Sequence, residues 1–512
     1  MRKRKISILN LLQEELVVQS AHQFEITNLS IGQSIINRRR FLKNVVKTGI
    51  GFTAGGALLA SCNNSNSNPS VATVGILGAG IAGLQAAGIL SNAQIDCRVF
   101  EASHLPGGRM LTVYDALGKG SMVELGGEFI DSNHDDILAL VKEYGLELID
   151  IHADIKQKNL IKESYYFNNK FYTEREVINE FRKYADSIVT DINSLNAGDQ
   201  NLQKKFDGMS INEYLTSKGL QGWLFELLEK AFTAEYGLES AFQSSLNLLT
   251  MIDGSTEKGF KIYGTSDERY KIKGGTSLLI NKMADRIRQS ISFKHRCERI
   301  SYSDGLYKLE FNGQPPQFCK YLIVTIPFTA LRKVKIDLDL PEQKQRVIKE
   351  LHYGTNSKIS FGFSEAVWEA QGRSGYLFSS LIQNGWDGSL TTVNNDVRSF
   401  TIFQGGVQGK QMNIAESGTY LKYLNSLFPG MTAAHNGKVA VFNWATSSLS
   451  EGSYAVYRIG DWTSLAGLES VPVGNLYFAG EHCSDDFNGY MNGAAETGRK
   501  VAEQVIKKVI AD

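Results

Sequence analysis

The clearest pattern of hydrophobic and polar positions begins at residue 72. Residues 72–77 form a short apolar run bounded by turn residues, which is typical of a buried parallel strand. A glycine-rich turn follows at 78–83, residues 84–90 have helical periodicity, and residues 97–100 are again apolar. The pattern therefore predicts a strand, a tight turn, a helix and a second strand, which is the order of a βαβ unit.

The glycine-rich turn has the Gly-x-Gly-x-x-Gly spacing of a dinucleotide site. Gly78 suits the tight turn, Gly80 lets the backbone approach a pyrophosphate, and Gly83 permits close helix packing. The free N–H groups of the helix N-terminus attract phosphate. Glu101, 18 residues after Gly83, can accept a hydrogen bond from a ribose hydroxyl. The residues that we expect to bind the dinucleotide here are Gly78, Gly80, Ile81, Ala82, Gly83, Glu101 and Ala102.

The start of the chain has the parts of an export signal in their usual order. Residues 37–43, Asn-Arg-Arg-Arg-Phe-Leu-Lys, resemble the twin-arginine signal, and residues 44–60 form a weakly apolar stretch that is too short to span a membrane. Leu-Ala-Ser-Cys then resembles a bacterial lipobox, in which Cys62 would carry the lipid. We expect an export signal at 1–61 and a tether at 62–71; the alternative is a buried helix start with three arginines. The signal predicts a lipid-anchored protein on the periplasmic or cell-surface face of a bacterial membrane.

Composition and charge narrow the class of protein. The chain has 512 residues, 42% of them hydrophobic, with 54 Lys and Arg against 54 Asp and Glu. Nine of the basic residues lie in the first 61, so the remainder is mildly acidic and lacks the clustered basic charge of a nucleic-acid-binding protein. The cysteines after the lipobox are widely spaced, without a Cys-x-x-Cys pair or a histidine cluster, which predicts neither a metal site nor a disulfide framework.

Further glycine-rich motifs place the dinucleotide site in a family. The motifs are Leu105–Arg109, Val123–Ile130, Asn475–His482 and Gly489–Gly498. With shorter matches between them, they resemble the flavin amine oxidase family, which includes monoamine oxidases, polyamine oxidases and L-amino acid oxidases. The resemblance covers about residues 72–508 and implies that the cofactor is FAD. The FAD-binding residues that it adds are Gly108, Arg109, Gly126, Gly127, Cys297, Glu481, Tyr490 and Met491.

The order of the motifs predicts an α/β fold in which two domains are interleaved. One is a Rossmann-like FAD-binding domain made of residues 72–150, 265–335 and 440–508. The other is an α+β substrate domain, with helices in 151–264 and a mixed sheet with helices in 336–439.

The resemblance also implies the chemistry. In amine oxidases a hydride passes from the carbon next to a primary or secondary amine to flavin N5; the imine that results is hydrolysed, and peroxide forms on reoxidation. Lys358 lies at the position of the lysine that, in many members, is bound through a water molecule to flavin N5. The alternative is a surface lysine on an edge strand. Tyr454 and Tyr490 match an aromatic cage beside the flavin; the alternative is two core rings with hydroxyls bonded to backbone. Ser453 stands where mammalian monoamine oxidases bond the flavin, so we expect FAD to be noncovalent.

Departures from the family motifs restrict the substrate. Phe129 occupies the position where L-amino acid oxidases carry an arginine for the carboxylate, so we expect an amine without one. Asp131 could pair with a distal ammonium group, or could cap the helix that is expected near Asn133. His134 and His482 have no partner at a catalytic or metal-binding spacing, so both are interpreted as structural.

Other functions remain open at this point. An L-amino acid oxidase uses the same cofactor and fold. Desaturases and protoporphyrinogen oxidases share the glycine motifs but need an apolar channel, and a non-catalytic lipoprotein would need neither the lysine nor the tyrosine pair. The leading hypothesis is an exported amine oxidase that takes a small-molecule amine and passes electrons to oxygen or another acceptor, without a nucleic-acid partner.

Overall fold

The computed structural model describes residues 71–257, 259–389 and 397–511, and begins with strand β1, Val71–Leu77. The predicted export signal at 1–61 and the lipobox cysteine Cys62 lie outside the described residues. Within the described ranges, no helix is long and apolar enough to cross a membrane.

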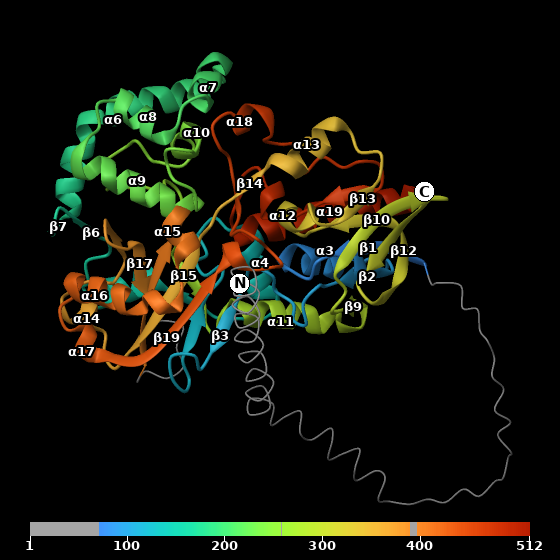
Figure 1. Cartoon of the computed structure of the whole chain (residues 1–512), viewed down its shortest axis with the longest axis horizontal. Helices are drawn as coiled ribbons and strands as arrows, with labels where there is room; N and C mark the ends of the chain where they lie inside the picture. The colour runs from blue at the N-terminus through green and yellow to red at the C-terminus, as the bar shows by residue number, and fades with distance from the viewer. Residues whose placement is uncertain (1–70, 258, 390–396, 512) are drawn as a thin grey trace, which may run out of the picture. The chain divides into compact units, whose positions relative to one another are not determined.

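Within this part of the chain, an eight-stranded sheet is built around β1 (Figure 1). The strand order is β13-β10-β11-β12-β1-β2-β9, and β21 pairs with β12. β1 runs parallel to β2 and β12, whereas β11 is antiparallel to both of its neighbours. The other strands are β2 (Cys97–Phe100), β9 (Ile291–Ser292), β10 (Cys297–Ser303), β11 (Leu306–Phe311), β12 (Gln314–Val324), β13 (Lys335–Asp337) and β21 (Leu476–Phe478).

Three helices pack together on the parallel part of this sheet: α3 (Ile81–Asn92), α11 (Thr276–Arg286) and α19 (Met491–Ala511). Their apolar faces share one core with β1 and β2. α3 has small residues on its buried face, and a Cβ at Gly498 of α19 would lie 2.3 Å from the Ala82 carbonyl oxygen. Small side chains therefore let these helices approach closely, and the predicted βαβ unit is present.

The second large sheet is mixed and has seven strands among the described residues. Its order is β19-β15-β18-β17-β16-β6-β7, in which only the β6–β16 pair is parallel. Every residue of β15 is buried, because the strand lies between β18 and β19. The strands are β6 (Ser164–Phe167), β7 (Lys170–Tyr172), β15 (Ser357–Phe363), β16 (Leu377–Ser379), β17 (Gln383–Asp387), β18 (Arg398–Gln404) and β19 (His435–Asn443).

A group of helices covers the β6 to β18 side of this sheet, drawn in green in Figure 1. The helix α9 contacts the sheet directly, and α8 starts at the predicted capping box, in which Ser210 Oγ accepts from Glu213 N at 3.1 Å. The helices are α6 (Glu174–Asn196), α7 (Gln200–Asp207), α8 (Ile211–Ser217), α9 (Gly222–Tyr236) and α10 (Ser245–Leu249).

Short elements connect these layers. The small strand pairs are β3 (Thr112–Tyr114) with β4 (Met122–Glu124), β5 (Leu148–Asp150) with β8 (Tyr270–Ile272), and β14 (His352–Tyr353) with β20 (Ala455–Val456). The remaining α-helices are α4 (Asp135–Glu143), α5 (Ile151–Gln157), α12 (Phe328–Leu331), α13 (Glu342–Glu350), α14 (Val367–Ala370), α15 (Gly406–Gln411), α16 (Ser417–Leu427), α17 (Met431–Ala434) and α18 (Asp461–Ser464).

The α/β fold class with mixed sheets and helices is confirmed, and two details differ from expectation. The segment 151–264 was expected to be helical, but β6 and β7 leave it to join the second sheet. Strand β19 ends at Asn443 and so crosses the expected boundary at 439. The domain division itself stays a prediction.

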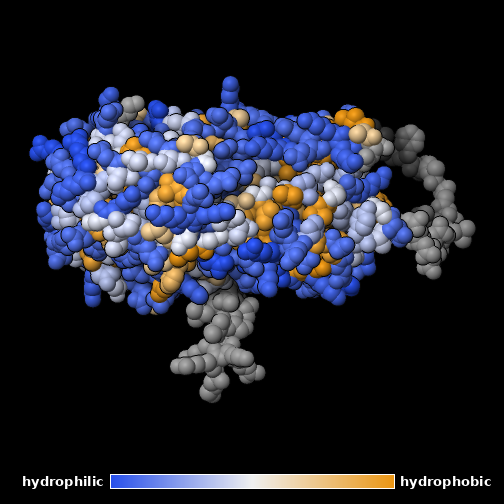
Figure 2. Space-filling model, turned by 90° about the horizontal axis from the view of Figure 1, so that it is seen from above, coloured by the Kyte–Doolittle hydropathy of each residue, from blue (hydrophilic) through white to orange (hydrophobic). Residues whose placement is uncertain are grey.

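The face shown in Figure 2 is mostly hydrophilic, with hydrophobic side chains in separate small areas.

Candidate active site

Gly78, in the turn between β1 and α3, and Gly83, in the first turn of α3, leave no room for a side chain. Gly78 has a φ of +106°, and a Cβ there would lie 2.7 Å from Thr325 Oγ1. A Cβ at Gly83 would lie 2.0 Å from the Gly78 carbonyl oxygen. These glycines are needed for packing within the protein, because helix, turn and strand meet there without room for a methyl group.

Gly80 and Gly108 are different, because space remains in front of them. A Cβ at Gly80 would meet only the Gly107 carbonyl oxygen, at 3.9 Å, and one at Gly108 would lie 3.7 Å from the Gly80 Cα. Gly80 is the N-cap residue of α3 and makes no side-chain hydrogen bond to the helix. The first N–H groups of α3, from Ile81 and Ala82, therefore start beside an open backbone surface, which suits a pyrophosphate.

Glu101 stands at the end of β2 and is bonded to this turn. Its Oε2 accepts from Ala79 N at 2.7 Å, and its Oε1 accepts from Ser103 N at 2.8 Å. Two backbone donors hold the carboxylate in place, and its remaining lone pairs can accept from ribose hydroxyls. Ala102 follows directly. Together with the open glycines, this donor and acceptor set fits the dinucleotide part of FAD.

Arg109 connects three of the predicted motifs. Its Nη1 donates to Glu481 Oε1 at 2.6 Å and to the Ser453 carbonyl oxygen at 2.8 Å. Glu481 Oε2 in turn accepts from Gly489 N at 3.1 Å. This ion pair thus ties the second glycine motif to the C-terminal motif, and it places Arg109 and Glu481 beside each other as FAD-binding candidates.

The Gly126-Gly127 turn is packed against protein on both sides. A Cβ at Gly126 would lie 2.1 Å from the Arg109 carbonyl oxygen, and one at Gly127 would lie 2.7 Å from Met491 Sδ. Met491 begins α19, so the turn touches the start of that helix.

Cys297, at the start of β10, is half-buried, and burial raises its pKa to about 12, so its thiol stays protonated.

Lys358 is not a surface lysine on an edge strand, so that alternative is wrong. It lies on the interior strand β15, with 5% of its surface exposed. Its Nζ donates to the Gly126 carbonyl oxygen at 2.9 Å and to Glu128 Oε2 at 2.8 Å, and lies 5.0 Å from the centre of the Trp386 ring. The lysine is therefore bonded to the predicted flavin-site turn by two acceptors.

A second buried lysine shares the same carboxylate. Lys271 Nζ donates to Glu128 Oε1 at 2.5 Å and to the Asp387 carbonyl oxygen at 3.2 Å. Trp386 Nε1 donates to Glu128 Oε2 at 3.1 Å. Burial by itself raises the pKa of Glu128, but the charges of Lys271 and Lys358 outweigh it and lower that pKa below its usual range. Glu128 is consequently a buried carboxylate between two lysines.

Tyr454 and Tyr490 meet at one residue, Glu235, near the end of α9. The Tyr490 hydroxyl lies 3.3 Å from Glu235 Oε1, and the Tyr454 hydroxyl donates to the Glu235 carbonyl oxygen. Burial raises the pKa of both phenols well above the usual range, so both stay protonated donors. The backbone bond of Tyr454 matches the core-ring alternative, but both tyrosines keep some accessible surface and so are not sealed in a core.

Carboxyl groups gather around these tyrosines. Burial raises the pKa of Glu235 to about 7 and that of Glu268 to about 8. Nearby Asp131 adds to both shifts, and its Oδ1 accepts from Glu268 N at 2.7 Å. Glu268 has a φ of +47°, a backbone conformation that a non-glycine residue rarely adopts and that is often found at functional sites. The lining beside the tyrosines is therefore acidic.

The two alternatives for Asp131 have different outcomes. It does not cap a helix that begins near Asn133, because α4 starts at Asp135 and His134 is its N-cap residue. Instead, Asp131 Oδ2 lies 3.3 Å from His134 Nε2. A contact between Asp131 and substrate stays a prediction.

The ring nitrogens of His482 have no partner among the described residues, and burial lowers its pKa to about 3, so it is neutral.

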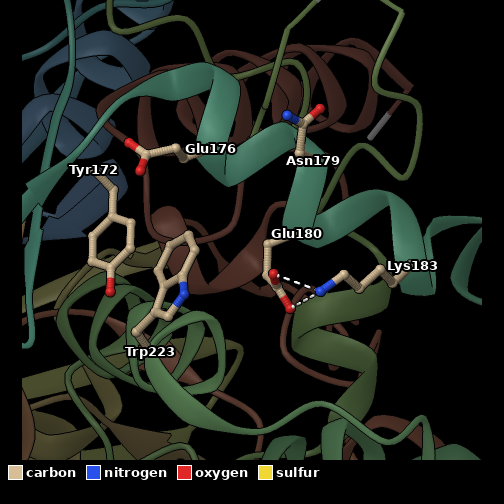
Figure 3. A pocket seen from close by; sticks show the side chains of 6 residues that line it. All are labelled: Tyr172, Glu176, Asn179, Glu180, Lys183 and Trp223. Atoms are coloured by element: carbon tan, nitrogen blue, oxygen red, sulfur yellow. Dashed lines mark hydrogen bonds and ion pairs between the residues drawn. The ribbon is translucent and has the colours of Figure 1, made fainter.

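A separate surface pocket of about 340 Å³ lies between α6, β7 and α9 (Figure 3). Its side chains interact mainly with one another: Tyr172 stacks on Trp223 with ring centres 3.9 Å apart, and Lys183 Nζ donates to Glu180 at 2.7 Å. None of the predicted site residues lines it. The lining residues are Tyr172, Glu176, Asn179, Glu180, Lys183 and Trp223.

Four charged residues of the site were not predicted from the sequence: Glu128, Lys271, Glu235 and Glu268. Two carried a signal that could have been used. Lys271 interrupts the apolar Tyr-Lys-Ile of β8, and Glu128 directly follows the Gly-Gly pair. Charged residues at buried positions are rare unless paired, so each pointed to a partner, although not to which one.

Comparisons with known proteins agree with this geometry. The family model described as flavin containing amine oxidoreductase matches residues 81–412 and 416–506. The amine oxidase [flavin-containing] A of Canis lupus familiaris is 24% identical over 452 residues, covering 84% of this chain and 84% of that protein. An L-amino acid dehydrogenase of Synechocystis sp. is 25% identical over 453 residues, covering 84% of this chain and 94% of that protein.

Solved structures share the fold. Cyclohexylamine oxidase from Brevibacterium oxydans IH-35A superposes with a TM-score of 0.74 at 19% identity, covering 86% of this chain and 100% of the other. Wild-type putrescine oxidase bound to putrescine has a TM-score of 0.73 at 18% identity, covering 86% and 99%. At such low identity these matches establish the architecture, while the substrate has to be argued from the residues of this chain.

Proposed function

Since this chain belongs to the flavin containing amine oxidoreductase family, we propose that its substrate is an amine without an α-carboxylate. The chain is an FAD-dependent oxidoreductase that acts on CH–NH bonds, as its family is. The finer assignment rests on the charges beside Tyr454 and Tyr490.

The acidic lining is the observation that carries the proposal. The Glu235 carboxyl accepts from the Tyr490 hydroxyl, and its backbone carbonyl accepts from the Tyr454 hydroxyl. Asp131 raises the pKa of Glu235, and both of these groups raise the pKa of Glu268, so the three carboxyl groups lie close together. An ammonium group that enters this lining favours release of the carboxyl protons of Glu235 and Glu268 and so gains an opposite charge, whereas a carboxylate meets only neutral or like-charged carboxyl groups in a poorly solvated site. The same carboxyl groups argue against the apolar channel of a desaturase.

Phe129 supports the same choice. It stands where an L-amino acid oxidase carries its carboxylate-binding arginine, and its ring packs on Trp386 with centres 5.1 Å apart. Lys271 lies 4.8 Å from the Phe129 ring centre, but its Nζ is already bonded to Glu128. The second candidate function, oxidation of an amino acid, is favoured only by the similarity to the L-amino acid dehydrogenase.

The side chains have simple tasks in this reaction. Bound FAD, held by the glycine turns, Glu101, Arg109 and Glu481, supplies the two-electron acceptor. Tyr454 and Tyr490 orient the amine and keep bulk water away, which is the main contribution that a protein makes to such a reaction. The imine product is hydrolysed by water, and oxygen as acceptor gives peroxide.

Ser453 offers no thiol, and its hydroxyl bonds Asn356 Oδ1 at 2.5 Å, which supports noncovalent FAD.

Tyramine and tyrosine form a matched pair that tests the proposal, because they differ only in the α-carboxylate. Burying an unpaired carboxylate costs several kcal/mol, and each 1.4 kcal/mol is about tenfold, so tyramine should reduce the flavin roughly a hundredfold faster or more. Anaerobic stopped-flow bleaching of the flavin measures both rates. Equal or faster reduction by tyrosine would reject the proposal and favour an amino acid oxidase or dehydrogenase.

Two further parts of the proposal come from the sequence alone. The twin-arginine motif and the lipobox at Cys62 support export and a lipid anchor on a bacterial membrane. The motif order supports an FAD domain of three segments interleaved with a substrate domain, with the last boundary moved from 439 to beyond Asn443 because β19 ends there.

A further inference from the structure

We propose that Glu128 is a positioning residue for Lys358, and that Lys271 joins these two side chains in one unit that holds a net positive charge at the predicted flavin site. This inference rests on the proposed function, because it assigns the Lys358 position to the flavin site. It adds two residues, 143 positions apart in the chain, for which the family motifs suggest no role.

The geometry shows why Lys358 needs Glu128. Lysine side chains are flexible, and ordering one costs rotamer freedom that its contacts must offset. Here the Nζ is fixed by the Gly126 carbonyl oxygen at 2.9 Å and by Glu128 Oε2 at 2.8 Å. Trp386 reinforces the arrangement, because its Nε1 donates to the same Oε2 at 3.1 Å. Glu128 therefore decides where the Lys358 ammonium lies relative to the Gly126-Gly127 turn.

Lys271 provides the second charge. Its side chain is 1% exposed, and its Nζ lies 2.5 Å from Glu128 Oε1. One carboxylate between two ammonium groups gives these three buried side chains one net positive charge. Two further buried carboxyl groups interact with them, Glu124 with Glu128 and Lys358, and Asp387 with Lys271, and burial raises the pKa of both, that of Glu124 to about 7. A single Glu128–Lys358 pair would have positioned the lysine equally well, so the added effect of Lys271 is electrostatic.

A net positive charge has a definite consequence for a flavin. Reduction adds electrons, so a nearby cation stabilises the reduced form more than the oxidised form, and it does so strongly where water is excluded. Lys271 should accordingly raise the midpoint potential of bound FAD. The sign of this effect separates an electrostatic role from a structural one, since a packing defect has no reason to follow the net charge.

The test measures the midpoint potential of FAD in the holoenzyme by reductive titration without any amine. Lys271→Met makes the unit neutral and should lower the potential by about 30 mV or more, the equivalent of a tenfold shift for a two-electron couple. Glu128→Gln leaves two cations and should raise it. The double variant restores the original net charge, so its potential should return toward that of the parent protein.

Lys273→Met is the matched control. Lys273 lies two residues further along, has a side chain that is 65% exposed and pairs with Glu147, so its loss should leave the potential unchanged. The amine-dependent reduction rate of the double variant should stay at least tenfold low, because Lys358 has lost its acceptor although the net charge is restored. This divergence of rate and potential is the signature of a positioning role.

Several results would overturn the inference: a Lys271→Met potential equal to that of the Lys273→Met control, shifts of the same sign in the two single variants, or a parent-like rate in the double variant. If one single variant fails to fold, the sign of the shift in the other still decides. An enzyme that reduces its flavin with amino acids instead of amines would contradict the proposed function, while the titration without amine would still report on Lys271.

Discussion

Glu235→Gln should make the protein more stable at pH 8 and at the same time a poorer amine oxidase. The substitution keeps the shape of the side chain and an oxygen for the Tyr490 hydroxyl, and it removes the carboxyl group. Burial is the largest influence on Glu235 and raises its pKa to about 7 from an ordinary value of 4.5. The group is therefore costly to ionise in the folded protein.

The size of the effect follows from that shift. A shift of about 2.5 pKa units corresponds to about 3 kcal/mol, which is an upper value because the side chain keeps some surface in the site. The folded state holds a proton that the unfolded state has already released between pH 4.5 and 7. Stability is thus complete below pH 4.5 and is lost as the pH rises through about 7. Glu235→Gln has no such loss, so it should gain about 1–3 kcal/mol over the parent protein at pH 8.

Thermal unfolding of the holoenzyme at pH 4.5 and pH 8 measures this difference. The parent protein and Glu235→Gln should unfold at similar temperatures at the lower pH, and the variant should unfold a few °C higher at pH 8. Glu229→Gln, on the same helix with a side chain that is 32% exposed, is the control and should show no pH-dependent gain. A hydrogen bond to a charged group contributes about 1.5–3 kcal/mol, so KM for a suitable amine should rise about ten- to a hundredfold at pH 8.

A Glu235→Gln variant that is less stable than the parent protein at pH 8 would contradict this prediction, because the carboxylate would then be paired in the folded protein and not costly to ionise. An unchanged KM together with increased stability would show that Glu235 does not contact the substrate, and only its effect on the pH dependence of stability would remain.

The site and the predicted export signal at 1–61 give three other expected outcomes. Acid or heat should release free FAD from the yellow holoenzyme, since Ser453 cannot form a thioether, and flavin that stays with the precipitated protein would contradict this. Lys358→Met should keep FAD bound, because Lys271 still pairs with Glu128, while flavin reduction or reoxidation slows by about an order of magnitude or more, measured by stopped flow; unchanged turnover would exclude Lys358 from the site. Cys62→Ala should release the protein from membranes, and Arg39→Lys with Arg40→Lys should retain a precursor inside the cell; fractionation unaffected by both would show that the predicted export signal is wrong.

Local patterns in the sequence determined the dinucleotide part of the site. The strand, turn and helix at the first glycine motif involve neighbouring residues, so their spacing carries the geometry; the Ser210 capping box is predictable for the same reason. The family motifs added Lys358 and the two tyrosines because each lies in a short recognisable stretch. These features depend on interactions within about 30 residues and are therefore visible in the sequence.

Tertiary structure alone decided which charges meet. Glu128 lies 143 residues from Lys271 and 230 from Lys358, and Glu235 lies 255 residues from Tyr490. Whether a lysine on a strand faces water or a buried carboxylate depends on the order of strands in the sheet, and β15 is interior only because β18 and β19 flank it. The residue type is the same whether a charged side chain faces water or a buried partner. The partner depends on packing between distant segments of the chain. The charge unit at Lys358 and the acidic lining at the tyrosines therefore could not be derived from the sequence.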